Sequence, residues 1–423
     1  MDLADLDWLR TSDGARAAAA AAALLASGAT VLHGIAALRR AYTPAQARAA
    51  LALVEGRHVA AAKFPDGDRL FCDRAAAEQS SSAAVATWTA RRFAGARRIA
   101  DLGCGMGGDA LALARHAPVL AVDRDAARVG MTVANAGVRG LASRVDAVVG
   151  DMRTLALSRD IDAAWLDPAR RDARGRIRDP ARWSPPLADA IALAATLPAA
   201  GIKLAPGIEL DALPSDGEVE FVSLAGDLVE AVLWLGRFAS IPRRATVIAA
   251  DGTPSVLAGD PGTTAPALLA EPAGYLFDPD PAVGRAGLIA WLAADLRLRQ
   301  LDPTIAYLTG DRPTDSPFAR RFRIDAWLPF AERTLLARLR ALGVGRVEVM
   351  RRGSPVDTNA LERRLNRALG AGTGTPAVRT VAPAVRTVAL TRVRGAHVAI
   401  VCERERSSSG GPQDVSDAAR ELE

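Results

Sequence analysis

The sequence predicts an α/β protein with a Rossmann-like, seven-stranded sheet, an N-terminal helical region and a small C-terminal α+β domain. From about residue 97, short apolar runs alternate with stretches of helical length, and the runs are "RRIAD", "VLAVD", "VDAVVGD", "AAWLD" and "GIKLA". This alternation is typical of a parallel sheet covered by helices on both faces. Residues 218–237 then hold two β-like runs around a short turn. A hairpin there makes the last strand antiparallel and completes the seven strands.

The first 70 residues are predicted to be helical. In "TPAQARAALALVEGR", Thr43 is placed to cap a helix and Pro44 to occupy its first position. Residues 17–38 carry no charge over 22 positions, which is long enough to span a bilayer. They are mostly alanine, however, and alanine buries little apolar area. We therefore expect helices of a soluble bundle and no membrane partner.

The rest of the chain is predicted to form a connecting region and a second domain. One helix is expected near "AGLIAWLAADLRLR"; then a helix, "GRVEVMRRG", another helix and two β-like runs follow. The sequence "PAVRTVA" occurs at 376–382 and again at 383–389, which indicates a local duplication and not a solenoid. The predicted limits are 1–70 for the helical region, 71–240 for the α/β domain, 241–330 for the connecting region, 331–406 for the α+β domain and 407–423 for a disordered tail.

Basic residues are unevenly distributed. Only Lys63 and Lys203 are lysines among 53 basic residues, and the abundance of arginine and alanine indicates a coding bias. A lysine kept in such a chain is of interest because an ammonium and a guanidinium are not interchangeable at a site. Residues 320–401 hold 16 arginines and 5 acids, a balance of +11, which leaves −6 for the remainder. A basic C-terminal domain indicates nucleic-acid binding, and a solvated basic face without a partner is the alternative.

Cysteine and histidine patterns indicate a reducing compartment and no metal. Cys72, Cys104 and Cys402 are odd in number and far apart, and the four histidines have no metal-ligand spacing. The N-terminus begins with acidic residues and has no basic region typical of a signal peptide. We therefore expect a cytoplasmic protein.

A glycine-rich turn predicts a cofactor site. "RIADLGCGMGGDALALA" (98–114) has the order strand, turn and helix, and Asp123 follows Gly103 by 20 residues. The spacing Gly103-x-Gly105-x-x-Gly108 is that of a dinucleotide fingerprint. On this motif alone, NAD and S-adenosylmethionine (SAM) both fit.

Three acids favour SAM. Asp101 directly precedes the glycines, where it would repel a pyrophosphate but suits the ammonium of a methionyl group. Asp123 ends the second apolar run, and Asp151 follows the third, where an adenine amino group is expected. We therefore predict SAM as the cofactor; an α/β domain without a cofactor is the alternative.

A motif at 165–172 and Lys203 are predicted to contact the substrate. "WLDPARRD" (165–172) follows the fourth apolar run, and Lys203 lies at the end of the next one in "GIKLAPGI". Both are expected to face the same crevice, beyond the carboxyl ends of the strands. Asp167 is predicted to accept a hydrogen bond from a substrate N–H, while Pro168 stiffens the turn. Lys203 is predicted to contact a phosphate or orient a substrate carbonyl, and a functional role for Lys63 is as plausible as a structural one.

The motifs "DLGCGMGGD", "AVDRD" and "LDPAR" resemble those of class I SAM-dependent methyltransferases over about residues 70–237. The resemblance implies these cofactor contacts: Asp101, Gly103 and Gly105 at the methionyl part, Asp123 at the ribose and Asp151 at the adenine. It leaves Asp109 either capping a helix or facing the amino acid. Amino-methylating relatives have an aromatic residue two positions after the proline, where this chain has Arg170. Arg170 either supplies a cation–π platform or the target is held in another way.

"FCDRAAAEQSSSAAVATW" (71–88) resembles the segment before the glycine motif in trimethylguanosine synthases. The matching positions are Glu78, Gln79 and Ser80, and the resemblance places Gln79 near the cofactor. The alternative is a plain helix cap with Ser81 and Ser82 in the first turn.

More broadly, the chain resembles bacterial methyltransferases that end in a THUMP-like domain, through "YLFDPDPAVGRAG" and "MRRGSPVDTNALERRL" among other segments. THUMP domains position RNA, so the resemblance implies an RNA partner, rRNA or tRNA. A small-molecule methyltransferase and a non-catalytic SAM- or RNA-binding protein are the alternatives. Methylation at uracil C5 is excluded because it needs a thiolate nucleophile and no cysteine stands in a suitable motif. Transfer to a nitrogen or a hydroxyl needs mainly in-line positioning.

Overall fold

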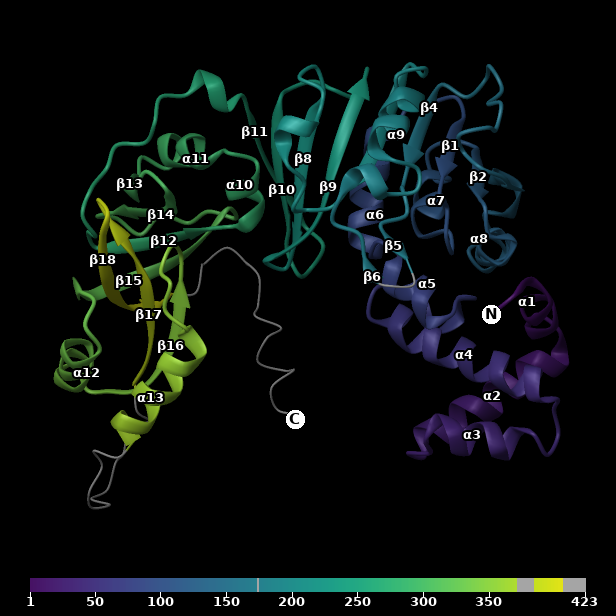
Figure 1. Ribbon diagram of the computed structural model, residues 1–423, viewed down its shortest axis with the longest axis horizontal. Helices are drawn as coiled ribbons and strands as arrows, with labels where there is room; N and C mark the ends of the chain where they lie inside the picture. Colours follow the sequence, from purple (N-terminus) through teal and green to yellow (C-terminus); the bar gives the residue numbers. More distant parts are fainter. Residues whose placement is uncertain (173–174, 371–383, 406–423) are drawn as a thin grey trace. The chain divides into compact units, whose positions relative to one another are not determined.

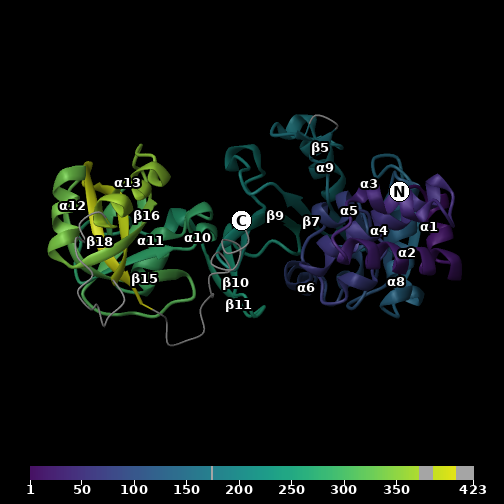
Figure 2. The same ribbon diagram turned by 90° about the horizontal axis from the view of Figure 1, so that it is seen from below.

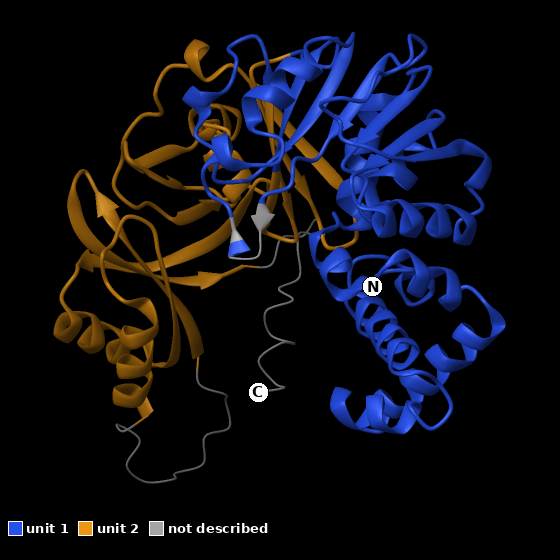
Figure 3. Cartoon of the chain, turned by 45° about the vertical axis from the view of Figure 1, so that its right-hand side comes forward, with its two compact units in different colours: residues 1–218, 231–240 blue, residues 219–230, 241–423 orange. Residues whose placement is uncertain are grey.

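The computed structural model describes residues 1–172, 175–370 and 384–405. The chain forms two compact units (Figure 3): unit 1 comprises residues 1–218 and 231–240, and unit 2 comprises residues 219–230 and 241–423. The predicted tail (407–423) and the first "PAVRTVA" copy lie outside the described residues.

Unit 1 begins with helices, as predicted. They are α1 (Leu3–Leu9), α2 (Ser12–Ala26), α3 (Val31–Leu38) and α4 (Pro44–Ala61), shown in purple and blue in Figure 1. Thr43 caps α4 and exchanges side-chain-to-backbone hydrogen bonds with Gln46, and Pro44 is the first helical residue. The uncharged stretch is divided between α2 and α3, and the left-handed Gly28 (φ +82°) lies between them. In the part of the chain that is described, no helix is long and apolar enough to cross a membrane.

The central sheet has nine strands in the order β11-β10-β8-β9-β7-β4-β1-β2-β3. Strands β3, β2, β1, β4 and β7 run parallel, and β9 is antiparallel to β7, which confirms the predicted layout. The predicted count of seven is exceeded because β10 returns parallel to β8 and pairs with β11. The bounds are β1 (Ile99–Leu102), β2 (Val119–Asp123), β3 (Val145–Val149), β4 (Ala163–Leu166), β7 (Ala199–Leu204), β8 (Glu218–Leu224), β9 (Asp227–Gly236), β10 (Arg243–Ile248) and β11 (Pro254–Gly259).

Aromatic side chains form the centre of the unit 1 core. Phe93 packs edge-on against Trp165, Trp234 and Phe238, with ring centroids 4.8–6.4 Å apart. Such pairs add to the stabilisation from buried area. The helices of this part are α5 (Arg74–Gln79), α6 (Ala83–Ala90), α7 (Gly108–Leu113), α8 (Ala126–Val138) and α9 (Leu187–Ala194), and a short ribbon, β5 (Arg171–Asp172) and β6 (Gly175–Arg176), follows β4.

Unit 2 contains a second sheet of seven strands in the order β13-β14-β12-β15-β18-β17-β16. The predicted connecting region is therefore built largely of strands, and the expected helix near residue 290 is α11. Residues 384–389 of the second "PAVRTVA" copy lie in β17. The elements are β12 (Tyr275–Pro279), α10 (Pro281–Arg285), α11 (Ile289–Asp295), β13 (Arg299–Asp302), β14 (Ile305–Gly310), β15 (Ala319–Pro329), α12 (Glu332–Ala341), β16 (Val344–Arg351), α13 (Thr358–Gly370), β17 (Ala384–Val393) and β18 (Ala396–Arg404).

Helices α12 and α13 are amphipathic. Their leucines, among them Leu335 on α12 and Leu365 on α13, pack with Val388 and Val401 of the sheet. The opposite helix faces are polar and exposed. The α+β arrangement predicted for this part of the chain is present, and β15 belongs to the same sheet.

Candidate active site

The ends of β1, β4 and β7 bring the predicted residues together. Asp101 is the third residue of β1 and lies beside Trp165 of β4, Asp167 follows β4 directly, and Lys203 lies in β7. Because these parallel strands are neighbours in the sheet, their carboxyl ends lie at one edge. This edge is where α/β proteins of this type bind their ligands.

Lys203 is the centre of a buried polar cluster. Its Nζ lies 2.9 Å from Asp167 Oδ2, 2.8 Å from Ser81 Oγ and 3.5 Å from Asp109 Oδ2, and the residue is only 4% exposed. Three partners around one point suit a compact ammonium, whereas a planar guanidinium spreads its donors. The structure therefore gives a physical reason for a lysine at this position.

Asp167 keeps one oxygen for another partner. Lys203 holds Oδ2, while Oδ1 accepts no hydrogen bond from a described residue, and the side chain is 23% exposed. The ion pair orients the carboxylate, and Pro168, which is buried, fixes the backbone after it. The arrangement provides an oriented hydrogen-bond acceptor at the open edge of the sheet.

Asp101 is a buried carboxyl without a hydrogen-bond partner. It is 1% exposed, and neither oxygen accepts a hydrogen bond from the described residues. Burial raises the pKa of Asp101 well above its usual value, and the negative charges of Asp109 and Asp167 raise it further, while Lys203 opposes them. Native proteins rarely leave a buried polar group unsatisfied without a functional reason. The orphaned carboxyl is suited to a cationic ligand such as an ammonium.

The glycine-rich turn packs tightly against the strand-end residues. Gly103 has φ +108°, and a Cβ there would lie 2.6 Å from the carbonyl oxygen of Asp167. A Cβ at Gly108 would collide with Ser80 Oγ. Glycine is needed at Gly103 because of its positive φ and the close backbone carbonyl, whereas a larger residue at Gly108 would displace the Ser80 hydroxyl.

Asp123 and Asp151 lie at the ends of the next two strands. Asp123 Oδ2 accepts a hydrogen bond of 3.0 Å from the backbone N–H of Gly105, so this carboxylate is tied to the glycine turn. The Arg153 side chain bonds to both oxygens of Asp151 and lowers the pKa of that carboxyl to about 2. The parallel register puts Asp123 opposite Val149, two residues before Asp151. Asp123 therefore lies next to the turn, and both acids lie outside the Lys203 cluster.

Ser81, and not Gln79, enters the cluster. Gln79 is an exposed residue at the end of α5. Ser81 Oγ lies between Lys203 Nζ and Asp109 Oδ2, 3.3 Å from the latter. Ser82, by contrast, caps α6. The sequence predicted Ser81 only as part of a helix start. Its contact with Lys203 in the folded protein distinguishes it from the neighbouring serines.

Lys63, the second lysine, forms hydrogen bonds with the segment that precedes Ser81. Lys63 Nζ donates hydrogen bonds to the carbonyl oxygens of Ala77, Glu78 and Ser80, at 3.0, 2.7 and 2.8 Å. These carbonyls lie at the end of α5 and just beyond it, where helix carbonyls lack partners within the helix. Both lysines of the chain therefore fix the short connection that carries Ser81.

Two polar residues of α8 support the glycine turn and were not predicted. Thr132 Oγ1 donates to the carbonyl of Gly105 at 3.0 Å, and Asn135 Nδ2 donates to that of Met106 at 2.9 Å. Both side chains are fully buried. Their spacing of three residues, which puts them on one helix face, was the available signal in the sequence.

Arg170 stacks on a tryptophan of its own chain. Its guanidinium carbon lies 5.8 Å from the centroid of the Trp183 ring. Trp183 is buried, and its indole N–H donates to the carbonyl of Ile177. The motif has no aromatic residue two positions after Pro168, but Trp183 provides an aromatic ring in contact with Arg170.

Burial favours the protonated thiol form of the three cysteines. All three are free and buried, and burial raises the pKa of Cys72 to about 12 and those of Cys104 and Cys402 well above the usual value. A raised thiol pKa disfavours nucleophilic attack, in agreement with the exclusion of uracil C5 chemistry. The described residues include no group of three or more metal-ligating side chains.

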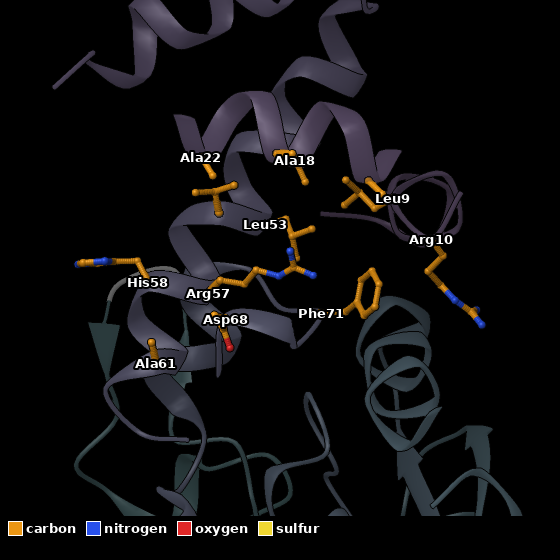
Figure 4. A pocket seen from close by; sticks show the side chains of 13 residues that line it. Leu9, Arg10, Ala18, Ala22, Leu53, Arg57, His58, Ala61, Asp68 and Phe71 are labelled. Atoms are coloured by element: carbon orange, nitrogen blue, oxygen red, sulfur yellow. The ribbon is translucent and has the colours of Figure 1, made fainter. Parts of the chain in front are cut away.

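A separate pocket of about 530 Å³ lies among the N-terminal helices (Figure 4). Its lining includes Leu53, Arg57 and Phe71, and Arg57 bonds to the carbonyls of Leu70 and Arg69. None of the predicted site residues lines it. The pocket is therefore distinct from the strand-end site.

Comparisons with known proteins agree with this geometry. A family described as RNA cap guanine-N2 methyltransferase matches residues 96–173, and one described as THUMP domain-like matches residues 319–404. The strand order and glycine turn are those of a class I SAM-dependent methyltransferase. An uncharacterized S-adenosylmethionine-dependent methyltransferase of Mycobacterium tuberculosis strain CDC 1551, and its counterpart in strain H37Rv, are each 36% identical over 305 residues, which cover 70% of this chain and 80% of the relative.

The chain therefore belongs to the S-adenosylmethionine-dependent methyltransferases with a C-terminal THUMP-like domain, and SAM is its cofactor. A solved structure from Porphyromonas gingivalis W83, provisionally assigned as a methyltransferase, has the same fold. The TM-score is 0.67 at 21% identity, with 86% of this chain and 92% of that chain covered.

Proposed function

We propose that the protein transfers the methyl group of SAM to a base of an RNA, rRNA or tRNA. The single observation that supports this most directly is the Lys203–Asp167 pair, which leaves Asp167 Oδ1 at the open edge of the sheet next to the glycine turn. When bound, SAM supplies an electrophilic methyl group on a sulfonium. The protein then has to align an acceptor atom with that methyl group.

We assign the cofactor contacts as follows. Asp101 pairs with the ammonium of the methionyl part, because it is the orphaned buried carboxyl. The backbone at Gly103 and Gly105 gives the methionyl part a close approach. Asp123 binds the ribose, and Asp151, held by Arg153, faces the adenine. Asp109 is assigned to the Lys203 cluster, and Gln79 is at most peripheral because of its exposure.

We assign Asp167 to the binding of the base that receives the methyl group. Its Oδ1 accepts an N–H of the target base and turns the nitrogen lone pair toward the methyl carbon. The N–CH₃ bond forms as the C–S bond breaks, and the nitrogen then loses a proton to water. Lys203 orients Asp167 through the 2.9 Å ion pair. Arg170, supported by Trp183, offers its free face to a stacked base.

The RNA assignment rests on the two matched families and on unit 2. Part of the basic excess there is neutralised, since Arg320 and Arg352 both bind the buried Asp278. Exposed arginines on the outer faces of α12 and α13 are in no ion pair with a described residue: Arg333, Arg338, Arg340, Arg363 and Arg367. Unpaired arginines on one pair of helices suit a phosphate backbone.

We further propose the domain limits given above and a cytoplasmic location. The location is supported by the three free, buried cysteines, which fit a reducing compartment.

Transfer of tritium from labelled SAM tests the substrate class. The purified protein is incubated with total RNA from a strain that lacks the gene, and in parallel with the small-molecule fraction of the same cells. We expect label in RNA. Label only in small molecules would support the small-molecule alternative, and SAM binding without any transfer would support a non-catalytic protein.

An Asp101→Asn variant tests the cofactor assignment. The loss of a charge-assisted contact to the SAM ammonium is expected to weaken SAM binding by about 100-fold, or about 3 kcal/mol. The folded-state pKa of Asp101 is raised, so wild-type stability falls as the pH rises from the ordinary Asp value through this raised pKa. Asparagine does not titrate, and the variant is therefore expected to unfold at a higher temperature than the wild type at neutral pH.

Calorimetry with SAM and thermal unfolding at several pH values measure both effects of Asp101→Asn. Unchanged SAM affinity together with a raised unfolding temperature would show that Asp101 is buried for a reason other than cofactor binding.

A further inference from the structure

The segment from Ala169 to Ser184, here called the arginine segment, directly follows Asp167 and Pro168. Its sixteen residues include six arginines and two aspartates. The rest of unit 1 is almost neutral, with 22 basic and 23 acidic residues. The positive charge of this unit is therefore concentrated beside the proposed catalytic acid.

The base of the arginine segment is fixed. Ala169 and Ser184 exchange backbone hydrogen bonds of 2.8 and 3.0 Å, so the segment starts and ends at one point, two residues after Asp167. Trp183 is buried under Arg170, and the Ile177 N–H donates to the Arg170 carbonyl at 2.8 Å. In Figure 2 the label β5 marks this segment at the periphery of unit 1. The positions of Arg170 and Trp183 relative to Asp167 are thus set by these hydrogen bonds and by the burial of Trp183.

Arg178 and Arg182 are exposed basic residues of the described part of this segment. Neither forms an ion pair with a described residue. Asp179, the acid between them, is used locally: its carboxylate accepts the N–H of Ala181 at 2.9 Å. Elsewhere in unit 1, Arg98 and Arg153 have carboxylate partners. The two guanidinium groups are therefore available to an anionic ligand.

We propose that Arg178 and Arg182 bind backbone phosphates of the RNA strand on either side of the target nucleotide, while Arg170 stacks on the target base. The proposal rests on the proposed function and adds a substrate contact within unit 1. An RNA strand fits better than an acidic protein, because planar guanidinium groups match phosphate geometry and Arg170, a stacking platform, belongs to the same segment. Phosphate contacts of this kind position the strand without reading its sequence.

An Arg178→Ala/Arg182→Ala double variant tests the proposal. Its matched control is Arg39→Ala/Arg40→Ala, which removes the same charge from exposed residues after α3. The KM for total RNA in the tritium assay and the salt dependence of binding to a labelled oligouridylate are measured for each, with SAM affinity as the test of folding. For the double variant we expect a KM about tenfold higher and a salt slope smaller by about 1.4, since each lost single-strand phosphate contact removes about 0.7.

The outcomes separate the two proposals. RNA labelling by the wild type with an unchanged KM and salt slope in the double variant would overturn this inference and leave the proposed function intact. Equal losses in the double variant and its control would indicate a general charge effect and would also overturn it. Absence of RNA labelling by the wild type would overturn both.

Discussion

An Asp167→Asn protein is expected to bind SAM normally and to lose about 10³-fold in methyl transfer. The loss corresponds to about 4 kcal/mol of transition-state stabilisation. The reason is that the side-chain amide cannot provide the oriented carboxylate that Lys203 holds at 2.9 Å. The close approach at Gly103 is to the backbone carbonyl of Asp167, which the substitution leaves in place.

Single-turnover tritium transfer measures the rate of methyl transfer, and calorimetry measures the affinity for SAM. The matched control is Asp160→Asn, which removes an exposed carboxylate before β4 that is paired only at the surface with Arg98. Full activity of Asp167→Asn with normal SAM binding would refute the assignment of Asp167 to the acceptor. Loss of SAM binding would instead place Asp167 on the cofactor side.

A Lys203→Met protein is expected to lose both activity and about 3–5 kcal/mol of its free energy of unfolding. The removal of one partner of a buried ion pair leaves the other charge without compensation. Here the affected groups are Asp167 and Asp109, with Ser81 losing its donor. Lys203→Arg is expected to recover little, because a guanidinium does not place three donors around one point.

Denaturant unfolding measures this loss, and a double-mutant cycle with Asp167→Asn shows how much of it belongs to the pair. In the double variant, the partly exposed carboxylate of Asp167 is removed together with its buried partner, so part of the stability is expected to return. If the two losses simply add, the contact between Lys203 and Asp167 does not stabilise the fold.

Much of the central fold was predictable because strand and helix periodicity survive in the sequence. The parallel direction of β1, β2, β3, β4 and β7 and the antiparallel β9 follow from the runs and the hairpin, whereas their spatial order does not. The cap at Thr43 followed from local chemistry alone. The two added strands β10 and β11 could not be predicted, since a polar, proline-rich segment does not show which sheet edge it joins.

The site was predictable only in part. The acids and glycines at strand ends were found because each follows an apolar run directly. The role of Ser81 was not, since it lies 122 residues before Lys203 in the chain and meets it only in the folded protein. Gln79 lies two residues before Ser81. Its exposure likewise depends on where α5 ends.

The sequence by itself determined most elements of the α/β domain and the residue types at the strand ends, because these depend on local periodicity and short motifs. Only the tertiary structure decided which charges meet. It gathered Asp109, Asp167 and Ser81 around Lys203, left Asp101 without a partner and placed Trp183 under Arg170. The physical reason is that ion pairing and burial depend on distances between segments, and those distances are set by the packing of the whole unit.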